Sequence, residues 1–242
     1  MFEISYTKVR AYLNCPWLYK LKFIDDWKAP PSPEASLGLS VHKALELYHQ
    51  RAASGGEAAM AALDEVWDRA GYRNAEEELA FYDRARELLE RYLRDIAASW
   101  PGRVKEIEKN FELTLPESNL KLIGIMDRID QMPDGSFALI EYKTHAAPWA
   151  ETRLADDLQM TIYSRAAEQA LGLSPLKLFF FFVSQGRAVE VSRGKQQWLE
   201  ARRALEDVAL KVKQGFFDPD RRYCPYCEMK RSCAYSTERS KT

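Results

Sequence analysis

Residues 120–144 read LKLIGIMDRIDQMPDGSFALIEYKT, and this stretch contains two strand patterns joined by a turn. Apolar residues follow a period of two over 120–132 and again over 137–144, which is the period of a β-strand. Pro133-Asp134-Gly135 between them suits a hairpin turn. The two segments are therefore predicted to be neighbouring strands of one sheet.

Three charged residues interrupt the apolar faces of this hairpin. Alternation places Asp127 on the face of Ile125 and Ile129, while Glu141 and Lys143 share a face of the second strand. A carboxylate on a core-facing row is costly unless it is paired or bound to a cation. Two carboxylates suit Mg²⁺ or Mn²⁺, and the lysine can orient or help to deprotonate a metal-bound water, which favours metal-assisted phosphodiester hydrolysis. The alternative is a structural Glu–Lys pair on an exposed strand face.

Helical and strand patterns fill the rest of the chain. The first helix pattern has Val9, Leu13 and Trp17 on one stripe. The whole pattern predicts an α/β fold, in which a central mixed β-sheet is flanked by helices and a helical insertion precedes the first strand. The predicted helices cover 5–24 (capped by Ser5 or Thr7), 36–53, 57–70, 76–99, 155–171 and 195–214, and the other predicted strands cover 104–115, 177–183 and a short segment ending at Ser192.

Composition excludes several classes of protein. The 242 residues are 46% hydrophobic and 29% charged, which is typical of a globular chain with a sizeable core. No apolar run approaches the roughly 20 residues of a membrane helix, and the first ten residues lack the pattern of a signal peptide, so a cytoplasmic location is expected. The net charge of −1 hides a basic segment over 211–242, with eight Lys or Arg against four Asp or Glu. That bias permits nucleic-acid binding without establishing it.

The four cysteines are Cys15, Cys224, Cys227 and Cys233, and the last three form a C-x2-C-x5-C motif. In a chain expected to be cytoplasmic, this clustering indicates a metal or cluster site rather than a disulfide framework. Four thiolates complete either a zinc tetrahedron or an iron–sulfur cluster, and spacing alone does not decide between them. A shared centre would join the two ends of the chain.

Together, these motifs resemble the RecB-type branch of the PD-(D/E)XK nuclease superfamily. The cysteine arrangement resembles the iron–sulfur staple of the CRISPR-associated RecB-like exonucleases and of AddB-type nuclease domains. The resemblance runs from Ser5 to Cys233 and implies a restriction-endonuclease-like core. The remaining motifs that carry it are Gly38-Leu39-Ser40-Val41-His42 with Leu45-Glu46, then 124–130, Glu141-Tyr142-Lys143-Thr144 and Gln159-Met160-Thr161-Ile162-Tyr163.

The resemblance implies one RecB-like nuclease domain over 1–242 and a role for each motif residue. It implies a catalytic core over 36–53 and 103–192, a helical insertion over 57–100, and an iron–sulfur staple made by 5–24 with 215–235. Glu141 stands where an aspartate is common in this branch. The implied metal ligands are His42, Asp127, Glu141 and the main-chain carbonyl of Tyr142, and the implied catalytic lysine is Lys143. Gln159 and Tyr163 are implied to position the substrate. A [4Fe–4S] cluster, with zinc as the alternative, is implied to be bound by Cys15, Cys224, Cys227 and Cys233. For His42 the alternative is a structural helix residue satisfied by Glu46.

The implied function is an Mg²⁺- or Mn²⁺-dependent DNA exonuclease that prefers single strands or DNA ends and leaves 5′-phosphate and 3′-hydroxyl ends. Its setting would be CRISPR adaptation or recombination and repair, with CRISPR adaptation proteins or a helicase as partners and no membrane partner. The aromatic and basic residues of 6–23, with Arg221, Arg222, Lys230 and Arg231, suit single-stranded DNA. The rival hypothesis is a catalytically inactive, cluster-containing DNA-binding or scaffold protein of the same fold.

Overall fold

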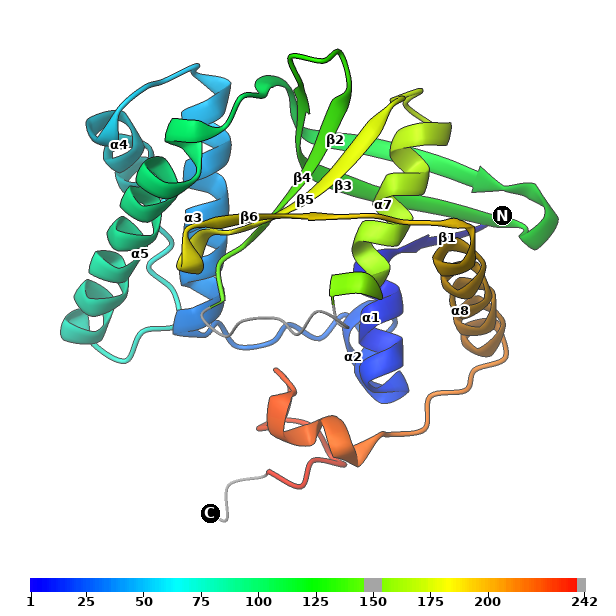
Figure 1. Cartoon of the computed structure of the whole chain (residues 1–242). Coiled ribbons are helices and arrows are strands. Elements are labelled where there is room, and N and C mark those ends of the chain that lie inside the picture. Colours follow the sequence, from blue (N-terminus) through cyan, green and yellow to red (C-terminus); the bar gives the residue numbers. More distant parts are fainter. Residues whose placement is uncertain (146–153, 239–242) are drawn as a thin grey trace. The chain divides into compact units, whose positions relative to one another are not determined.

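The computed structural model of the protein describes residues 1–145 and 154–238 (Figure 1). The chain divides into two compact units, and strands β2 (Arg103–Leu115) and β3 (Leu120–Gln131) contribute residues to both. Unit 1 comprises Met1–Pro30, Glu112–Gly124 and Lys195–Thr242, and unit 2 comprises Pro31–Phe111 and Ile125–Gly194.

The strands of unit 2 confirm the predicted mixed sheet. The second half of β3 pairs antiparallel with β4 (Phe137–Lys143), which pairs parallel with β5 (Leu176–Phe182). Strand β6 (Arg187–Val191) closes this order antiparallel to β5, while β2 pairs with β3. A parallel pair needs a crossover connection, and α7 (Leu158–Gln169) lies in the one between β4 and β5. The predicted hairpin is therefore part of an open α/β sheet.

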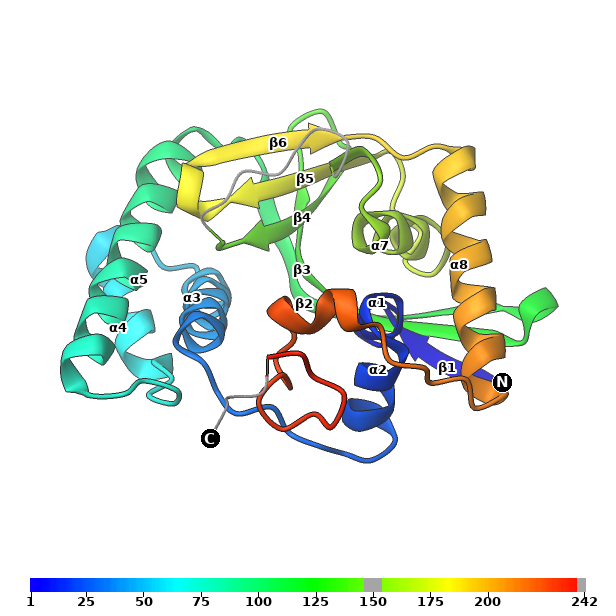
Figure 2. The same cartoon turned by 90° about the horizontal axis from the view of Figure 1, so that it is seen from below.

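Three helices of unit 2 lie side by side and cover one face of its sheet (Figures 1 and 2). They are α3 (Pro33–Gln50), α4 (Gly56–Val66) and α5 (Ala75–Asp95), and their apolar side chains pack with those of β4 and β5 in one core. Ser32 caps α3 by accepting the amide hydrogen of Ala35. The other face of β4 carries Glu141 and Lys143, and α7 packs against β4 and β5 there.

The strand face predicted to carry Asp127 toward the core is only partly buried, since Ile129 on it is 1% exposed but Ile125 is not buried. Ile125, expected to face the core with Asp127, is 45% exposed, whereas its neighbour Met126 is fully buried. The buried row of β3 continues with Arg128 and Asp130, which form an ion pair with each other. Mutual pairing allows both of these charged side chains to be buried in that row.

Unit 1 contains a strand and a helix break that the sequence patterns did not predict. Strand β1 (Phe2–Ser5) pairs parallel with the first half of β3, and Ser5 then caps α1 (Tyr6–Asn14), as predicted. The single helix expected over 5–24 is wrong, because Cys15 is extended and separates α1 from α2 (Pro16–Phe23). Pro16 begins the second helix without an amide hydrogen, which suits a first helical position.

The break also changes the predicted stripe of the first helix: Leu13 is 52% exposed, whereas Val9 is fully buried. The remaining regular elements of unit 1 are α8 (Lys195–Lys213) and a 3₁₀ helix over Arg221–Tyr226. No helix among the described residues is long and apolar enough to cross a membrane.

Candidate active site

The β3–β4 hairpin of unit 2 brings the predicted acids and lysine together. The pairing of Arg128 with Ile140 brings Asp127 beside Glu141 on the face opposite the helical core. Asp127 Oδ2 accepts the amide hydrogen of Tyr142 at 2.9 Å. Two residues along β4 from Glu141, Lys143 Nζ donates to Glu141 Oε1 at 3.0 Å.

Helix α3 supplies the imidazole of this group. His42 Nδ1 lies 3.6 Å from Asp127 Oδ2, and 31% of the His42 side chain is exposed. The imidazole ring stands edge-on to Tyr142, with ring centroids 6.0 Å apart. The structure thus places His42 against Asp127. Glu46 Oε1 accepts a hydrogen bond from Gln50 Nε2.

Helix α7 supplies an amide that joins the acid to the lysine. Gln159 Nε2 donates to Glu141 Oε1 at 2.8 Å, and Gln159 Oε1 accepts from Lys143 Nζ at 3.0 Å. Asp157 caps this helix by accepting the amide hydrogen of Met160, which fixes the turn that carries Gln159. Tyr163, one turn further on, is only 7% exposed, and its ring packs edge-on against Phe111.

Burial and mutual proximity set the protonation of these groups. Burial raises the pKa of Asp127 well above its ordinary value, and the nearby Glu141 raises it further. Burial also raises the pKa of Glu141, although Lys143 partly opposes that shift. Burial and the Lys143 charge lower the pKa of His42 to about 4, so its ring is neutral at pH 7. Burial would lower the pKa of Lys143, but Glu141 and Asp157 outweigh it and raise the pKa, so this amine is protonated.

A further acid, missed in the sequence, contributes to the same electrostatic environment. Glu108 adopts the left-handed region, with a φ of 48°, within β2. Its pKa is raised to about 6 by burial and by the charges of Glu46 and Glu141. Polar residues alternate along this strand and resemble an ordinary solvent-facing row. Sequence periodicity does not reveal such a local backbone distortion, because a left-handed residue other than glycine has no simple sequence signature.

The donor chemistry of the group fits a divalent cation. Carboxylate oxygens suit Mg²⁺ or Mn²⁺, and a neutral imidazole retains a free lone pair. Glu141 Oε2 is buried and has no hydrogen-bond partner among the described residues, so it is available to a cation. Within 1–145 and 154–238, no group of three or more His, Cys, Asp or Glu side chains is placed so that it could hold a metal ion. His42 lies against Asp127, and Glu141 is the cross-strand neighbour of Asp127, so a bound ion would need further ligands from water or substrate.

The four cysteines come together within unit 1. Cys15, Cys227 and Cys233 are each 9% exposed and pack in one small core that includes Met229. With Cys224 they line a small cavity of about 20 Å³. The main-chain amide of Asp220 donates to Cys15 Sγ at 3.3 Å. Burial raises the pKa of Cys227, and the neighbouring Cys15 and Cys233 raise it further. All four are free of disulfide bonds.

Comparison with known proteins identifies the family. A family model described as the PD-(D/E)XK nuclease superfamily matches residues 3–234. The chain belongs to the PD-(D/E)XK nuclease superfamily. A solved structure described as "Crystal structure of SSO0001" is similar at 16% identity, over 82% of this chain and 84% of that chain, with a TM-score of 0.39. No curated protein matches the chain significantly.

Membership assigns a general activity to the molecule. PD-(D/E)XK proteins are nucleases that generally use divalent metals such as Mg²⁺ or Mn²⁺, and the family implies a DNA substrate. Glu141-Tyr142-Lys143 matches the (D/E)XK part of the superfamily motif. In the PD part, Met126 stands in place of the proline before Asp127. The hairpin that carries these residues is thus the expected location of the nuclease chemistry.

The surface expected to stack on DNA is smaller than the sequence suggested. In this PD-(D/E)XK nuclease, Tyr12 and Tyr19 are each 5% exposed and pack edge-on against each other, so they are not available to nucleobases. Tyr226 is instead 79% exposed. Of the basic residues predicted to bind DNA, Arg222 pairs with Asp220 and Lys230 donates to the carbonyl oxygen of Pro225, while Arg221 and Arg231 are exposed.

Proposed function

We propose that the protein is a metal-dependent DNA exonuclease that prefers single-stranded DNA or DNA ends. The observation that carries the proposal is the grouping of His42, Asp127, Glu141 and Lys143 at one hairpin in a chain of nuclease family. An inactive scaffold of the same fold would not need a largely buried lysine paired with the buried Glu141 beside Asp127. Such an arrangement is costly unless it serves a charged ligand.

We assign Mg²⁺ or Mn²⁺ to His42, Asp127, Glu141 and the main-chain carbonyl of Tyr142. The unpartnered Oε2 of Glu141 and the low pKa of His42 support this assignment, since both leave a lone pair available at neutral pH. A bound divalent ion supplies a nucleophilic water and stabilises charge on the phosphate. The protein's own contribution is to hold these donors in a fixed, partly desolvated geometry.

Lys143 is assigned the role of a fixed positive charge. Its raised pKa keeps the amine protonated, so it orients the attacking water or stabilises the developing phosphate charge, and does not accept a proton in that state. Gln159 supports this role because it bonds both Lys143 and Glu141. Tyr163, buried beside Phe111, is proposed to contribute to the substrate-binding surface through the packing of α7.

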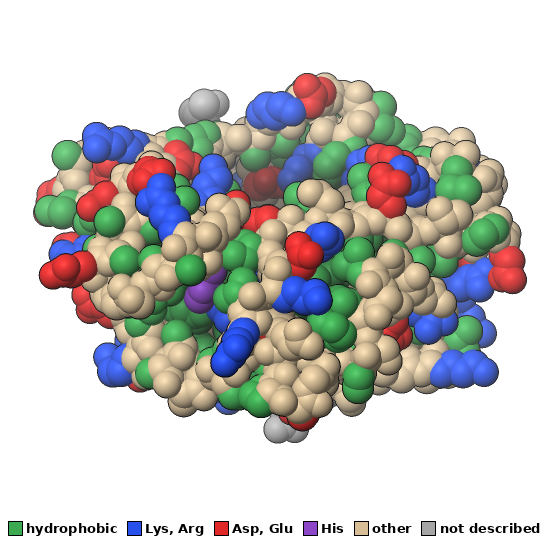
Figure 3. All heavy atoms as spheres, turned by 90° about the horizontal axis from the view of Figure 1, so that it is seen from above, with side chains coloured by type: hydrophobic (Ala, Val, Ile, Leu, Met, Phe, Trp, Pro, Cys, Tyr) green, Lys and Arg blue, Asp and Glu red, His purple; other side chains and the backbone are tan. Residues whose placement is uncertain are grey.

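The preference for single strands rests on exposed groups of unit 1. Tyr226 offers an aromatic face, and Arg221 and Arg231 offer cations, which is the chemistry that binds unpaired bases and their phosphates. On the face in Figure 3, basic and acidic side chains are interspersed, so that face carries no single large basic surface. We propose a cytoplasmic setting in CRISPR adaptation or in recombination and repair, with CRISPR adaptation proteins or a helicase as partners.

The activity assay compares three substrates of one sequence: end-labelled single strands, the blunt duplex and a closed single-stranded circle. With Mn²⁺ or Mg²⁺, we expect stepwise loss of nucleotides from the linear single strand, slower loss from the duplex and none from the circle. EDTA should abolish every reaction. Rapid cleavage of the circle would replace the exonuclease assignment with an endonuclease. Absence of cleavage under all metal conditions would favour the inactive scaffold.

Mn²⁺ should stabilise the protein more at high pH than at low pH. The raised pKa values of Asp127 and Glu141 mean that these acids hold protons at a higher pH than ordinary carboxylates, and metal must displace those protons. At a concentration of about 100 times Kd, Mn²⁺ should contribute about 2.7 kcal/mol at pH 8 and less at pH 6. His42, with its pKa of about 4, does not compete in this range. Thermal unfolding at pH 6, 7 and 8, with and without Mn²⁺, measures the trend, and an equal or larger shift at pH 6 would contradict the ligand assignment.

We further propose that Cys15, Cys224, Cys227 and Cys233 hold a [4Fe–4S] cluster, with zinc as the alternative. Their shared cavity and lack of disulfide bonds support a four-thiolate centre in either case.

Protein purified anaerobically should show an absorption band at about 400 nm, because thiolate-bound iron–sulfur clusters are coloured and zinc sites are not. Cys227→Ser should remove this band and the bound iron. Met229→Leu, a change at the fully buried neighbour, should retain both. A colourless protein with stoichiometric zinc would establish the alternative.

A further inference from the structure

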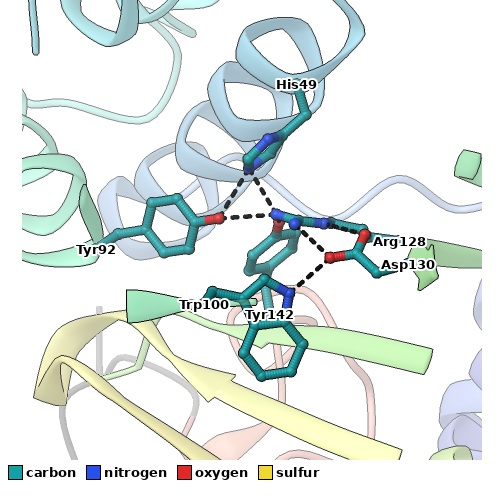
Figure 4. Close-up of polar contacts among 6 residues, drawn as sticks. All are labelled: His49, Tyr92, Trp100, Arg128, Asp130 and Tyr142. Carbon is teal, nitrogen blue, oxygen red and sulfur yellow. Dashed lines mark hydrogen bonds and ion pairs between the residues drawn. The ribbon is translucent and has the colours of Figure 1, made fainter. Parts of the chain in front are cut away.

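We propose that a buried polar network behind the hairpin positions the metal ligands of unit 2 through Tyr142. This inference rests on the proposed function. The back-face network consists of His49, Tyr92, Trp100, Arg128, Asp130 and Tyr142 (Figure 4). It lies on the face of β3 and β4 opposite Asp127 and Glu141, because Arg128 and Tyr142 each follow one of these acids by one residue.

The centre of the network is an ion pair with almost no exposure. Arg128 Nε donates to Asp130 Oδ1 at 2.7 Å, a terminal guanidinium nitrogen donates to Oδ2 at 2.5 Å, and the two side chains are 4% and 0% exposed. Trp100 Nε1 donates to the same Oδ2 at 2.7 Å. Replacing a buried ion pair with apolar residues is often neutral or stabilising, so stability alone does not explain this pair. Its fork geometry instead fixes the direction of the guanidinium.

The other terminal nitrogen of Arg128 connects the pair to three rings. It lies 2.9 Å from Tyr92 Oη, 3.3 Å from Tyr142 Oη and 2.9 Å from His49 Nε2. The guanidinium can only donate, so His49 Nε2 accepts from it, and Tyr92 Oη is 2.8 Å from the same ring nitrogen. Burial and the Arg128 charge accordingly lower the pKa of His49 to about 3, which keeps the ring neutral. The guanidinium is thereby held by α3, α5, β3 and β4 at once.

Tyr142 connects this network to the proposed metal site. Its hydroxyl accepts from Arg128 on the back face, while its main-chain amide donates to Asp127 Oδ2 at 2.9 Å. Its ring also stands edge-on to His42. A rotation or shift of Tyr142 would therefore move the hydrogen bond that orients one proposed ligand and the ring that supports another. Partners that orient ligands in this way typically change metal affinity 10- to 100-fold when they are removed.

The network also gives a role to the segment predicted as a helical insertion. Tyr92 lies on α5 and Trp100 follows it, and both contact the Arg128–Asp130 pair or its hydrogen-bond partners. The insertion is thus hydrogen-bonded through Tyr92 to Arg128, on the strand that carries Asp127. It supports the proposed site from the face of the sheet opposite the acids.

The test is Tyr142→Phe, which removes the hydroxyl and retains the ring and the main-chain amide. We expect its Kd for Mn²⁺, measured by titration calorimetry or electron paramagnetic resonance, to rise about 10-fold. Tyr92→Phe, which removes another acceptor of Arg128, should show the same effect and serves if the first variant fails to fold. At saturating Mn²⁺, the kcat of Tyr92→Phe should be near the wild-type value, because Tyr92 is not a proposed metal ligand and its hydroxyl contacts Arg128 and His49 on the back face. Leu63→Ala, a change at a fully buried position of the same core but outside the network, is the control for stability and should leave the Kd unchanged.

The outcomes separate this inference from the proposed function. Wild-type protein that binds Mn²⁺ and cleaves DNA, with wild-type Kd in both tyrosine variants, would overturn the positioning role alone. A raised Kd in Leu63→Ala equal to that of the tyrosine variants would also overturn it, since general destabilisation would then explain the effect. Wild-type protein that binds Mn²⁺ without cleaving DNA would overturn the nuclease assignment while a selective change in Kd still supported positioning. Wild-type protein that binds no Mn²⁺ would overturn both.

Discussion

Replacing Lys143 with alanine should lower the rate of DNA cleavage about 10³-fold, the upper range for loss of one preorganised charged donor. The Lys143 side chain is 13% exposed, and its amine donates hydrogen bonds to Glu141 and Gln159. Its pKa is raised, so the amine is a fixed cation in a partly desolvated environment. The variant should bind Mn²⁺ as tightly as the wild type or more tightly, because it removes a positive charge beside the proposed ligands. Cleavage kinetics at saturating Mn²⁺, together with the Kd, separate chemistry from metal binding.

Lys177→Ala is the matched control for this variant. Lys177 lies on the neighbouring strand β5, pairs with Asp134 and is 37% exposed, so its loss should leave both cleavage and metal affinity unchanged. Equal degradation by the wild type and Lys143→Ala would refute the catalytic assignment. A 10³-fold loss accompanied by an equal loss of Mn²⁺ affinity would instead make the lysine a structural support of the metal site.

Glu141→Gln should abolish cleavage and remove the stabilisation by Mn²⁺. Glutamine retains an oxygen that can accept from Lys143 and Gln159, but it replaces the buried, unpartnered Oε2 with a nitrogen that cannot bind a cation. We expect a loss of about 10³-fold or more in cleavage and an unfolding temperature unchanged by Mn²⁺. Without metal, the variant should be no less stable than the wild type at pH 8, since burial opposes the charged form of Glu141.

Glu190→Gln provides the control for loss of one acid from the same sheet. Glu190 is exposed on β6, and its replacement should preserve both cleavage and the Mn²⁺-dependent rise in unfolding temperature. A Glu141→Gln variant with the full Mn²⁺ shift would show that the ion is held elsewhere. Glu108, whose pKa is also raised, would then be the next candidate ligand.

The local patterns predicted the elements that carry the site. Alternation and the Pro133-Asp134-Gly135 turn correctly gave the β3–β4 hairpin, because a buried strand and a tight turn each constrain residue types over a few positions. Ser5, one of the two predicted caps (Ser5 or Thr7), begins α1. The family followed from the order of the motifs, and the match over 3–234 confirms the superfamily.

Errors arose wherever a distant partner decides the environment of a residue. Arg128 and Asp130 carry charge in the middle of a strand, yet both are buried because they pair with each other and with Tyr92 and Trp100, which lie far away in the sequence. The break at Cys15 is a local exception, because the residue before Pro16 is pushed to an extended conformation, and the apolar stripe of Val9, Leu13 and Trp17 outweighed that signal in the prediction. The left-handed conformation of Glu108 was hidden by an ordinary alternation of polar residues.

The sequence by itself determined the hairpin, the acids and lysine on its strands, the helix that carries His42 and the superfamily, since all of these depend on short-range periodicity and on the order of motifs. Only the tertiary structure decided which face of β3 is buried, that Gln159 bridges Glu141 to Lys143, and that a buried arginine network lies behind the acids. The physical reason is that burial, pKa and hydrogen-bond partners depend on groups brought together from several elements, and residue spacing along one strand does not encode these contacts.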